Sequence, residues 1–232
     1  MKIAILIRGF HYITKETTRQ RRHSTSPTVF DFREVFFSFI TQIYQPLLDK
    51  QHTINVYTIT YHSKIEESLK YIPGIKNIKF NSTESTQFQT FKEGIKSIPD
   101  EYELYLITRF DLFYKQNLEK WFPKEIQLNE PVLYAGFKET LNAGNAGGIG
   151  DCFFLFTQKG KKLLEEYLNE TKTLPNFHKI NKPLSQKGMH VKTLFDGHFD
   201  SNTSFDTRPD CKNPLYIMWG RPYHHKDIPD KP

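Results

Sequence analysis

Two patterns of apolar positions alternate along the first 110 residues of the chain. Short apolar runs rich in β-branched residues predict strands, and they cover residues 2–8, 53–61, 75–80 and 102–108. Between them, apolar residues spaced by three and four predict helices through residues 32–47, 65–72 and 88–98. Asp31 with Glu34, and Ser63 with Glu66, have the spacing of capping boxes at the start of the first two helices.

This alternation of strand and helix predicts an α/β fold, with a mostly parallel central sheet and helices on both faces. Ligands of such sheets bind beyond the carboxyl ends of the strands. The first strand is not followed by Gly-x-Gly-x-x-Gly, and no Walker loop occurs anywhere in the sequence. A dinucleotide enzyme and a P-loop NTPase are therefore disfavoured.

The second half of the chain has a different pattern. Strands are predicted at residues 131–137 and 151–156, and a helix at 158–171. The stretch after Thr173 is rich in Pro, Asn and Asp and has weak periodicity. We expect one domain over residues 1–232, with a nucleotide-binding half at 1–114 and an acceptor-side half at 115–232 that ends in an irregular tail.

Composition narrows the classes of protein. The chain has 232 residues, of which 38% are hydrophobic, and no apolar run approaches the ~20 residues that span a bilayer. The apolar run that opens the chain is too short for a signal peptide and ends at Arg8. The two cysteines, Cys152 and Cys211, are too few for a disulfide scaffold, which favours a reducing compartment and a cytoplasmic location, although one bridge between them stays open.

The net charge of +6 is half local. Lys15, Arg19, Arg21 and Arg22, less Glu16, contribute +3 within residues 15–22. Such a cluster suits a phosphate-bearing ligand or peripheral contact with an anionic membrane better than specific binding of nucleic acid. A solvated loop explains the same charges equally well.

The fourth predicted strand ends in Arg109-Phe110-Asp111. Because side chains alternate along a strand, Arg109 and Asp111 share one face and Phe110 points to the other. A carboxylate here could bind a hard cation, and the guanidinium could pair with a phosphate. An ordinary structural ion pair between the two side chains is an equal alternative.

This layout resembles the GT-A glycosyltransferases, in which an acidic motif, usually Asp-x-Asp, follows an apolar strand after about a hundred residues. The stretch from Tyr102 to Tyr114 looks like a variant with Arg-x-Asp in its place. The resemblance implies a nucleotide-sugar donor, UDP- or GDP-linked, a glycan or other hydroxyl acceptor, and a divalent metal, Mn²⁺ or Mg²⁺, bound by Asp111. It also implies that Arg109 contacts the donor.

Two further segments extend the resemblance. The stretch from Gly147 to Thr157 looks like the acceptor-facing region of polysaccharide-building transferases, in which an acid precedes paired aromatic residues. Carried over, this makes Asp151 the base of an inverting reaction and puts Gly148, Gly150 and Phe153 on the acceptor side, while Asp151 could instead cap a turn. At the end of the first strand, the resemblance gives donor contacts to Ile7, Arg8 and Gly9, more loosely to Phe10, with the loop at 15–22 closing over the diphosphate.

GT-A metals often take a late ligand near the carboxyl terminus. We favour His198, within Asp196-Gly197-His198-Phe199-Asp200. Other candidates are His190, His224, His225, Asp196 and Asp200. The alternatives to a glycosyltransferase are a metal-dependent nucleotidyltransferase and a non-catalytic module that binds a nucleotide-sugar.

Overall fold

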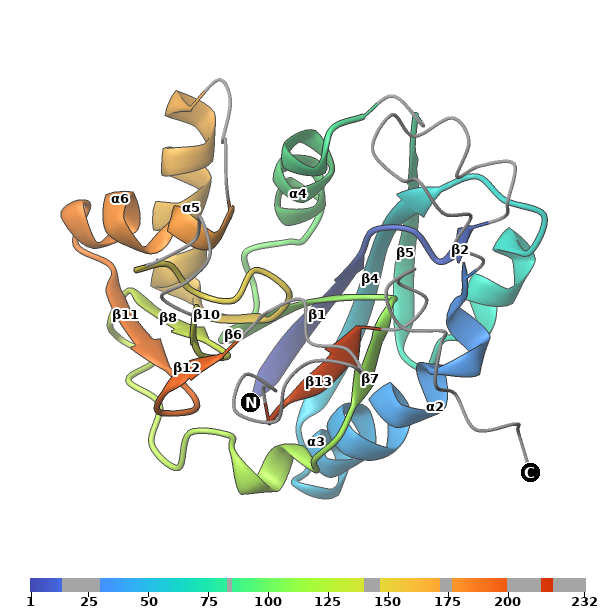
Figure 1. The fold of residues 1–232 in the computed structure, drawn as a ribbon, viewed down its shortest axis with the longest axis horizontal. Helices are drawn as coiled ribbons and strands as arrows, with labels where there is room; N and C mark the ends of the chain where they lie inside the picture. Colours follow the sequence, from blue (N-terminus) through green and yellow to red (C-terminus); the bar gives the residue numbers. More distant parts are fainter. Residues whose placement is uncertain (14–29, 83–84, 140–146, 172–176, 200–213, 219–232) are drawn as a thin grey trace.

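A computed structural model describes residues 1–13, 30–82, 85–139, 147–171, 177–199 and 214–218 (Figure 1). Its central element is a seven-stranded sheet with the spatial order β11-β8-β10-β6-β1-β4-β5. The strands of this sheet are β1 Lys2–Arg8, β4 Thr53–Tyr61, β5 Ile75–Asn81, β6 Leu104–Arg109, β8 Val132–Ala135, β10 Phe154–Thr157 and β11 His190–Thr193. The predicted strands of both halves of the chain thus lie in one sheet.

The sheet is mostly parallel, as the sequence predicts. Neighbouring strands in β6-β1-β4-β5 run parallel, as do β8 and β11, whereas β10 is antiparallel to both of its neighbours, β6 and β8. The reversal at β10 brings the loop that precedes it, with Asp151, to the carboxyl end of β6. That loop belongs to the second half of the chain, so the sheet edge combines residues far apart in sequence.

Helices cover both faces of the sheet (Figure 1). On one face lie the 3₁₀ helix η1 Phe32–Glu34, α2 Phe36–Phe39, the π-helical η2 Ile40–Tyr44 and α3 Gln45–Asp49. On the other lie α4 Gln87–Lys96, α5 Gln158–Glu170 and α6 Asn181–Gln186. The alternation of β1 separates the two cores: Ile3, Ile5 and Ile7 belong to the first, and Ala4 and Leu6 to the second. The fold class predicted from the pattern is therefore confirmed.

The first helix differs from the prediction in two respects. Asp31 caps it by accepting from the backbone and the guanidinium of Arg33, and not through a box with Glu34. Its middle is a π turn, in which the Gln45 N–H bonds the Ile40 carbonyl five residues earlier. Pro46 follows at once, and because proline has no N–H and crowds the carbonyl four residues before it, the regular ladder cannot continue there.

The remaining helices vary in how well the pattern predicts them. The segment after β4 is a 3₁₀ helix, η3 Glu66–Tyr71, although Ser63 and Glu66 do bond each other near its start. A full capping box that the pattern did not reveal joins Thr86 and Gln89 at α4. After residue 173 the structure also contains regular elements, η5 Phe177–Lys179, α6 and β11, where we expected an irregular tail.

The small strands complete the described fold. They are β2 Tyr12–Ile13 with β3 Phe30–Asp31, β7 Leu112–Tyr114 with β13 Tyr216–Met218, and β9 Lys138–Glu139 with β12 His198–Phe199, and a short 3₁₀ helix, η4, covers Leu118–Lys120. Within the described part of the chain, no helix is both long enough and apolar enough to cross a lipid bilayer.

Candidate active site at the carboxyl edge of the sheet

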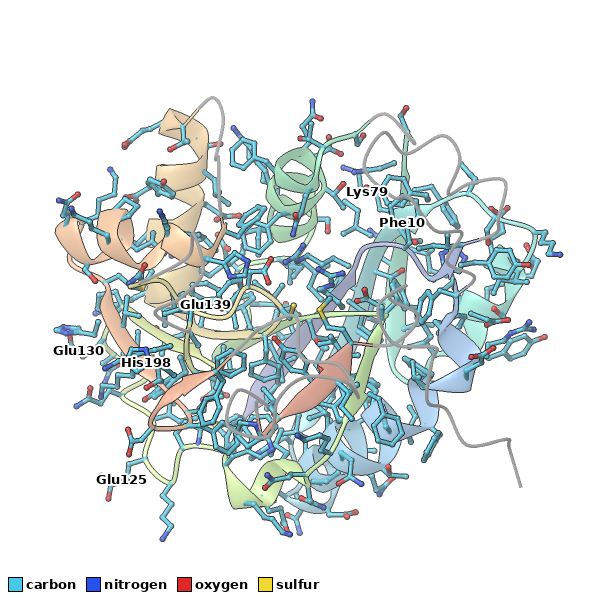
Figure 2. All side chains as sticks on the ribbon, in the orientation of Figure 1. Phe10, Lys79, Glu125, Glu130, Glu139 and His198 are labelled. Atoms are coloured by element: carbon cyan, nitrogen blue, oxygen red, sulfur yellow. The ribbon has the colours of Figure 1, made fainter. Side chains whose placement is uncertain are left out.

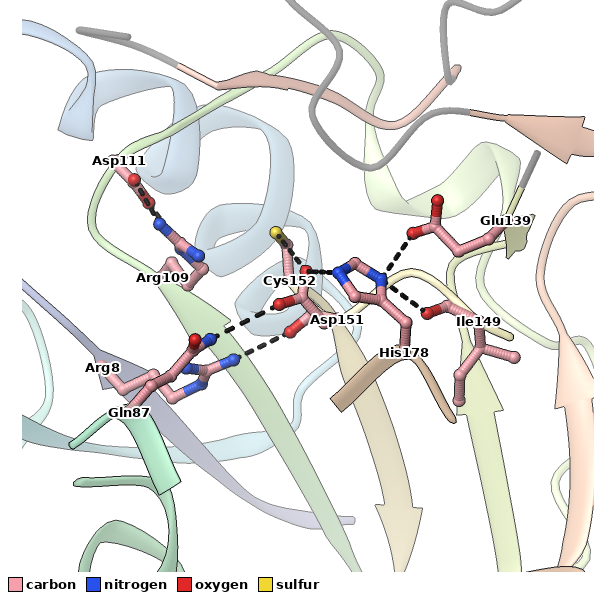
Figure 3. A network of polar contacts seen from close by, with 9 residues as sticks. All are labelled: Arg8, Gln87, Arg109, Asp111, Glu139, Ile149, Asp151, Cys152 and His178. Carbon is pink, nitrogen blue, oxygen red and sulfur yellow. Dashed lines mark hydrogen bonds and ion pairs between the residues drawn. The ribbon is translucent and has the colours of Figure 1, made fainter. Parts of the chain in front are cut away.

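A network of polar side chains lies where β1 and β6 end (Figure 3). Arg8 and Arg109 are register partners on these two parallel strands. Arg8 is only 3% exposed, and its Nη2 donates to the backbone carbonyl of Asp151 at 2.8 Å. The guanidinium of Arg8 also lies over the rings of Phe91 and Phe177, 5.2 and 5.5 Å from their centroids. Arg8 therefore connects the end of β1 to the loop that carries Asp151.

Arg109 and Asp111 form a two-pronged ion pair. The Nε of Arg109 donates to Oδ1 of Asp111 at 2.8 Å, and its Nη2 donates to Oδ2 at 2.5 Å. Their side chains are 18% and 19% exposed. Phe110 between them is buried and packs edge-on against Phe32, as strand alternation predicts. The structural ion pair that the sequence left open is thus present.

This pairing bears on the predicted cation. Both oxygens of Asp111 already accept from Arg109, and nowhere in the described ranges do three or more His, Cys, Asp or Glu side chains gather as a metal site would need. The residues that the structure describes therefore do not by themselves fit a divalent metal. We derive no step of the chemistry through one.

Asp151 is the centre of the second part of the network. It is 9% exposed, and its Oδ2 accepts from Nε2 of Gln87 at 3.4 Å. Its Oδ1 accepts from the thiol of Cys152 at 3.2 Å and lies 3.7 Å from Nε2 of His178. His178 in turn places Nδ1 at 2.8 Å from Oε1 of the buried Glu139. An imidazole thus stands between two carboxylates (Figure 3).

The electrostatics keep Asp151 ionised. Burial by itself raises the pKa of Asp151, but His178, Arg109 and Arg8 outweigh it, and the pKa lies below its ordinary value. Burial lowers the pKa of His178, but Glu139 and Asp151 outweigh it and raise the pKa overall. Asp151 is therefore an ionised carboxylate that can accept a proton or a hydrogen bond at this edge of the sheet.

The two arginines have opposite electrostatic balances. Burial and the neighbouring charge of Arg109 lower the pKa of Arg8. Burial also acts to lower the pKa of Arg109, but Asp111 raises it well above its ordinary value. Arg109 is the more accessible guanidinium of the two, and Asp111 fixes its plane. Arg109 can therefore meet a phosphate directly, whereas Arg8 meets the backbone of Asp151.

The acceptor-side residues of the prediction have structural contacts. The carbonyl of Gly148 accepts from the N–H of Glu139 at 3.1 Å. A Cβ at Gly150 would stand 2.9 Å from the ring of Phe137, so close packing with this ring requires glycine there. Phe153 is buried edge-on against Trp121, on the opposite face from Phe154. The contacts of these three residues hold the loop that carries Asp151. Gly150 packs against Phe137 and Phe153 against Trp121.

The end of β1 is arranged for a turn. The side chain of Ile7 is buried in the core beneath the first helix, so it packs against protein. Gly9 has a φ of +97°, a left-handed conformation, and a Cβ added there would meet nothing within 4 Å. Backbone conformation and not crowding is thus the reason for glycine at this position. Phe10 stacks on Tyr61 with centroids 3.9 Å apart.

The predicted late ligand His198 lies on β12, and its Nδ1 is 2.9 Å from the carbonyl of Glu139 (Figure 2). His198 thus contacts the backbone of Glu139 and lies beside the network of Figure 3, not within it. His190 is 60% exposed on β11. The candidates His224, His225 and Asp200, the basic loop at 15–22, and Cys211 lie outside the described residues.

Sequence reasoning missed His178, Glu139 and Gln87. Each lies on a different element, η5, β9 and α4, and only the fold brings them together around Asp151. His178 follows a stretch without clear periodicity, and Glu139 follows the predicted strand at 131–137, so neither had a local signal. His11 was also missed: it is 1% exposed, between the hydroxyls of Thr60 and Ser63.

A separate pocket of about 290 Å³ opens at the opposite, amino edge of the sheet. It is lined by residues that include Lys50, His52, Phe122, Ile126 and Leu128. None of the residues of the network in Figure 3 lines it. The chemistry at the carboxyl edge does not depend on this pocket.

Comparisons with known proteins address the fold. No protein-family model and no curated protein sequence matches the chain. Among solved structures, 4-diphosphocytidyl-2C-methyl-D-erythritol synthase from Anaerococcus prevotii is similar with a TM-score of 0.52 and 15% identity, over 90% of this chain and 94% of that one. At this identity the similarity establishes the fold alone.

Two glycosyltransferases are similar at TM-scores below 0.5. Drosophila β1,4-galactosyltransferase 7, in a complex with manganese, UDP-Gal and xylobiose, has a TM-score of 0.49 and 12% identity, over 99% of this chain and 75% of that one. The glycosyltransferase GlyE of Streptococcus pneumoniae has a TM-score of 0.47 and 15% identity, over 83% of this chain and 45% of that one. The chain has a mostly parallel, helix-flanked fold, which it shares with the Anaerococcus prevotii synthase.

Proposed function

We propose that this protein is a glycosyltransferase that moves a sugar from a nucleotide-sugar, UDP- or GDP-linked, to a hydroxyl of a glycan or other acceptor. One observation carries the proposal: an ionised, buried carboxylate, Asp151, lies beside Arg8 and Arg109 at the carboxyl edge of the central strands. Ligands of this class of sheet bind at that edge. A cationic group and a base in one place match the needs of sugar transfer from a diphosphate.

In the proposed reaction, an acceptor oxygen attacks the anomeric carbon of the donor and forms the new glycosidic bond. The bond between the anomeric carbon and the diphosphate oxygen breaks, and its electron pair leaves with the nucleoside diphosphate. The acceptor proton goes to the carboxylate of Asp151. Attack from the face opposite the leaving group inverts the configuration at that carbon.

Arg109 receives the leaving diphosphate in this proposal. It carries a fixed positive charge, and Asp111 holds its guanidinium plane from one side. Arg8 fixes the Asp151 backbone from below the site. Mn²⁺ or Mg²⁺ at Asp111 remains a prediction from the sequence, tested below with and without the cation. The division into a nucleotide-binding half, 1–114, and an acceptor-side half, 115–232, is likewise part of the proposal.

A nucleotidyltransferase is the second candidate, because one similar structure, with a TM-score of 0.52, is a synthase named for a diphosphocytidyl product. A nucleotidyltransferase would transfer a nucleoside monophosphate from a nucleoside triphosphate to a sugar phosphate. Pyrophosphate would leave from the triphosphate. The glycine- and lysine-rich loop typical of that class near the amino terminus is missing from this sequence. A non-catalytic module that only binds a nucleotide-sugar is the third reading.

A panel of nucleotide-sugars, screened by thermal stabilisation with Mn²⁺ and with EDTA, identifies the donor. Release of nucleoside diphosphate on addition of acceptor supports the proposal, and release of pyrophosphate from a triphosphate supports the second candidate. Binding without any turnover, measured by calorimetry, supports the module. In the decisive variant, Asp151→Asn, we expect kcat to fall by about 10²–10⁴ with donor Kd nearly unchanged. Equal losses in both would make Asp151 a binding or structural residue.

A further inference from the structure

We propose that Glu139 and His178 are positioning residues for Asp151: Glu139 fixes His178, and His178 holds the Asp151 carboxylate ionised and aimed at the acceptor. The inference rests on the proposed function of Asp151 as the base. Both residues act through Asp151 in this proposal, and the sequence pattern gave neither of them a role. The three side chains come from η5, β9 and the loop before β10, and they meet within hydrogen-bond or ion-pair distance.

Glu139 is a rigid anchor. It is 1% exposed and lies on β9, which pairs with β12. Its N–H bonds the carbonyl of Gly148, and its own carbonyl is 2.9 Å from Nδ1 of His198. A carboxylate buried this deeply requires a positive partner, and His178 at 2.8 Å supplies it.

The surroundings of His178 fix its charge state. Its Nδ1 lies 2.8 Å from Oε1 of Glu139 and 3.2 Å from the carbonyl of Ile149. Both of these groups only accept hydrogen bonds, so Nδ1 must carry a proton. Its Nε2 faces the Asp151 carboxylate at 3.7 Å, which is again an acceptor. With acceptors on both sides, the imidazolium satisfies the site and either neutral tautomer leaves one nitrogen facing a carboxylate without a proton.

The backbone holds the ring in this position. The carbonyl of His178 accepts from the N–H of Ile149 at 2.7 Å, which ties η5 to the loop that carries Asp151. Asp151 is therefore set by His178 from one side and by Arg8, through its backbone carbonyl, from the other. The imidazole cannot swing away without breaking both the Glu139 and the Ile149 contacts.

Other charged groups face Asp151 and set how much His178 matters. Arg8 and Arg109 favour the ionised Asp151 carboxylate. The buried side chains of Cys152 and Tyr216 lie near it, and Asp111 acts electrostatically on Cys152. Because Arg109 is largely balanced by Asp111, His178 is the positive group next to Asp151 that the structure can switch with one proton. Loss of the positive charge on His178 should raise the pKa of Asp151.

The first experiment reads the charge of His178 directly, in the full chain and without any substrate. Imidazole ¹⁵N shifts across pH 5–9 are compared for the wild type, Glu139→Gln, and the exposed control Glu130→Gln, whose carboxylate is 54% exposed and 4.0 Å from His190. We expect His178 to stay doubly protonated at neutral pH in the wild type and the control. In Glu139→Gln, which keeps an acceptor oxygen but loses the charge, it should become neutral by pH 7.

The second experiment follows the ionisation of Asp151 through the pH dependence of kcat. In Glu139→Gln and His178→Gln, the acidic limb of the kcat profile should move up by about one pH unit, which is about a tenfold loss of kcat on that limb, with donor KM within about twofold. A uniform loss of kcat at every pH, or an equal change in KM, would make the pair merely structural and would overturn the proposal. So would a wild-type His178 that is neutral at pH 7.

The two experiments separate the possible failures. If no donor gives turnover but His178 is doubly protonated and depends on Glu139, the proposed function fails while the arrangement of charges stands, and ¹³C titration of the Asp151 carboxyl then decides the proposal. A raised Asp151 pKa in Glu139→Gln supports it, and an unchanged pKa overturns it. If turnover is found and His178 titrates at its ordinary value, the further inference fails alone.

Discussion

Arg8 and Arg109 occupy the same register on adjacent parallel strands, yet their charges are stabilised in opposite ways. Arg109 has a carboxylate on two of its nitrogens, and its pKa is raised. Arg8 has one backbone carbonyl and two ring faces, its Nε has no hydrogen-bond partner in the described ranges, and its pKa is lowered. Two like charges side by side at a sheet edge are costly unless each is balanced, and Arg109 hydrogen-bonds a carboxylate whereas Arg8 hydrogen-bonds a backbone carbonyl.

We therefore expect the two arginines to differ in stability measurements. Arg109→Met leaves Asp111 without its partner and should lower the free energy of unfolding by about 2–4 kcal/mol. Arg8→Met removes a buried charge that the fold disfavours, which partly offsets the loss of its bond to the Asp151 carbonyl, so the loss should be smaller, about 1 kcal/mol. Urea denaturation at neutral pH measures both. The same loss in both variants would contradict the difference in their pKa directions.

Asp111 should matter for activity through its position beside Arg109. Asp111→Asn keeps the shape but loses the charge, so we expect loss of nucleotide-sugar hydrolysis and transfer. Because the side chains are about a fifth exposed, the accompanying loss of stability should be about 1–3 kcal/mol. Activity assays with Mn²⁺ and with EDTA measure the first effect, and thermal unfolding measures the second.

A comparison variant exists for Asp111. Asp31 makes the same two-pronged pair with Arg33, but Arg33 is 56% exposed. Asp31→Asn should leave activity near the wild-type level. If wild-type turnover persists in EDTA, Asp111 acts through Arg109 alone. If turnover requires Mn²⁺, Asp111 also acts through a cation. Full activity in Asp111→Asn would remove this residue from the mechanism.

His11 should make the protein less stable in mild acid. Burial lowers the pKa of His11 to about 4, and Glu66 and Asp31 only partly offset this. An unfolded histidine takes up a proton near pH 6.5, so between these values the unfolded state binds more protons and stability falls as the pH falls. The loss by pH 4 is at most about 3 kcal/mol. Midpoints of urea unfolding from pH 7 to pH 4 measure it.

His11→Gln is the matched variant for that measurement. Glutamine can still bond the hydroxyls of Thr60 and Ser63, which lie 2.6 and 2.7 Å from the ring nitrogens, but it does not titrate. Its stability should change less over this range than that of the wild type. Identical slopes in the two proteins would show that other groups cause the acid sensitivity.

Gly9 and Gly188 form a natural pair for testing the turn after β1. Their φ angles are +97° and +92°, and an added Cβ would meet nothing within 4 Å at either position. Alanine at either should therefore cost about 1–2 kcal/mol through backbone strain alone. Only Gly9→Ala should weaken donor binding, because Gly9 follows Arg8 at the candidate site, whereas Gly188 follows α6.

Calorimetry with the donor and chemical denaturation measure the two effects separately. Equal donor affinity in Gly9→Ala and Gly188→Ala would mean that the turn after β1 does not take part in binding. An unchanged stability in both would mean that the backbone relaxes out of the left-handed region.

The sequence by itself determined the order of strands and helices and the parallel character of the sheet, because the periods of two and 3.6 are local properties of the chain. The end of the fourth predicted strand singled out Arg109 and Asp111, and the resemblance to GT-A glycosyltransferases added Arg8 and Asp151. The pattern could not reveal that Pro46 turns part of the first helix into a π turn, since this depends on which carbonyls the helix can still reach.

Only the tertiary structure decided which partners these residues have. It joined Asp111 to Arg109, turned Phe153 toward Trp121, and brought Glu139 and His178 to Asp151 from separate elements. The physical reason is that burial and charge act through space, between groups that are far apart along the chain, such as Arg8 and Asp151. A carboxylate in a sequence has an ordinary pKa, and only its neighbours in the fold shift that pKa.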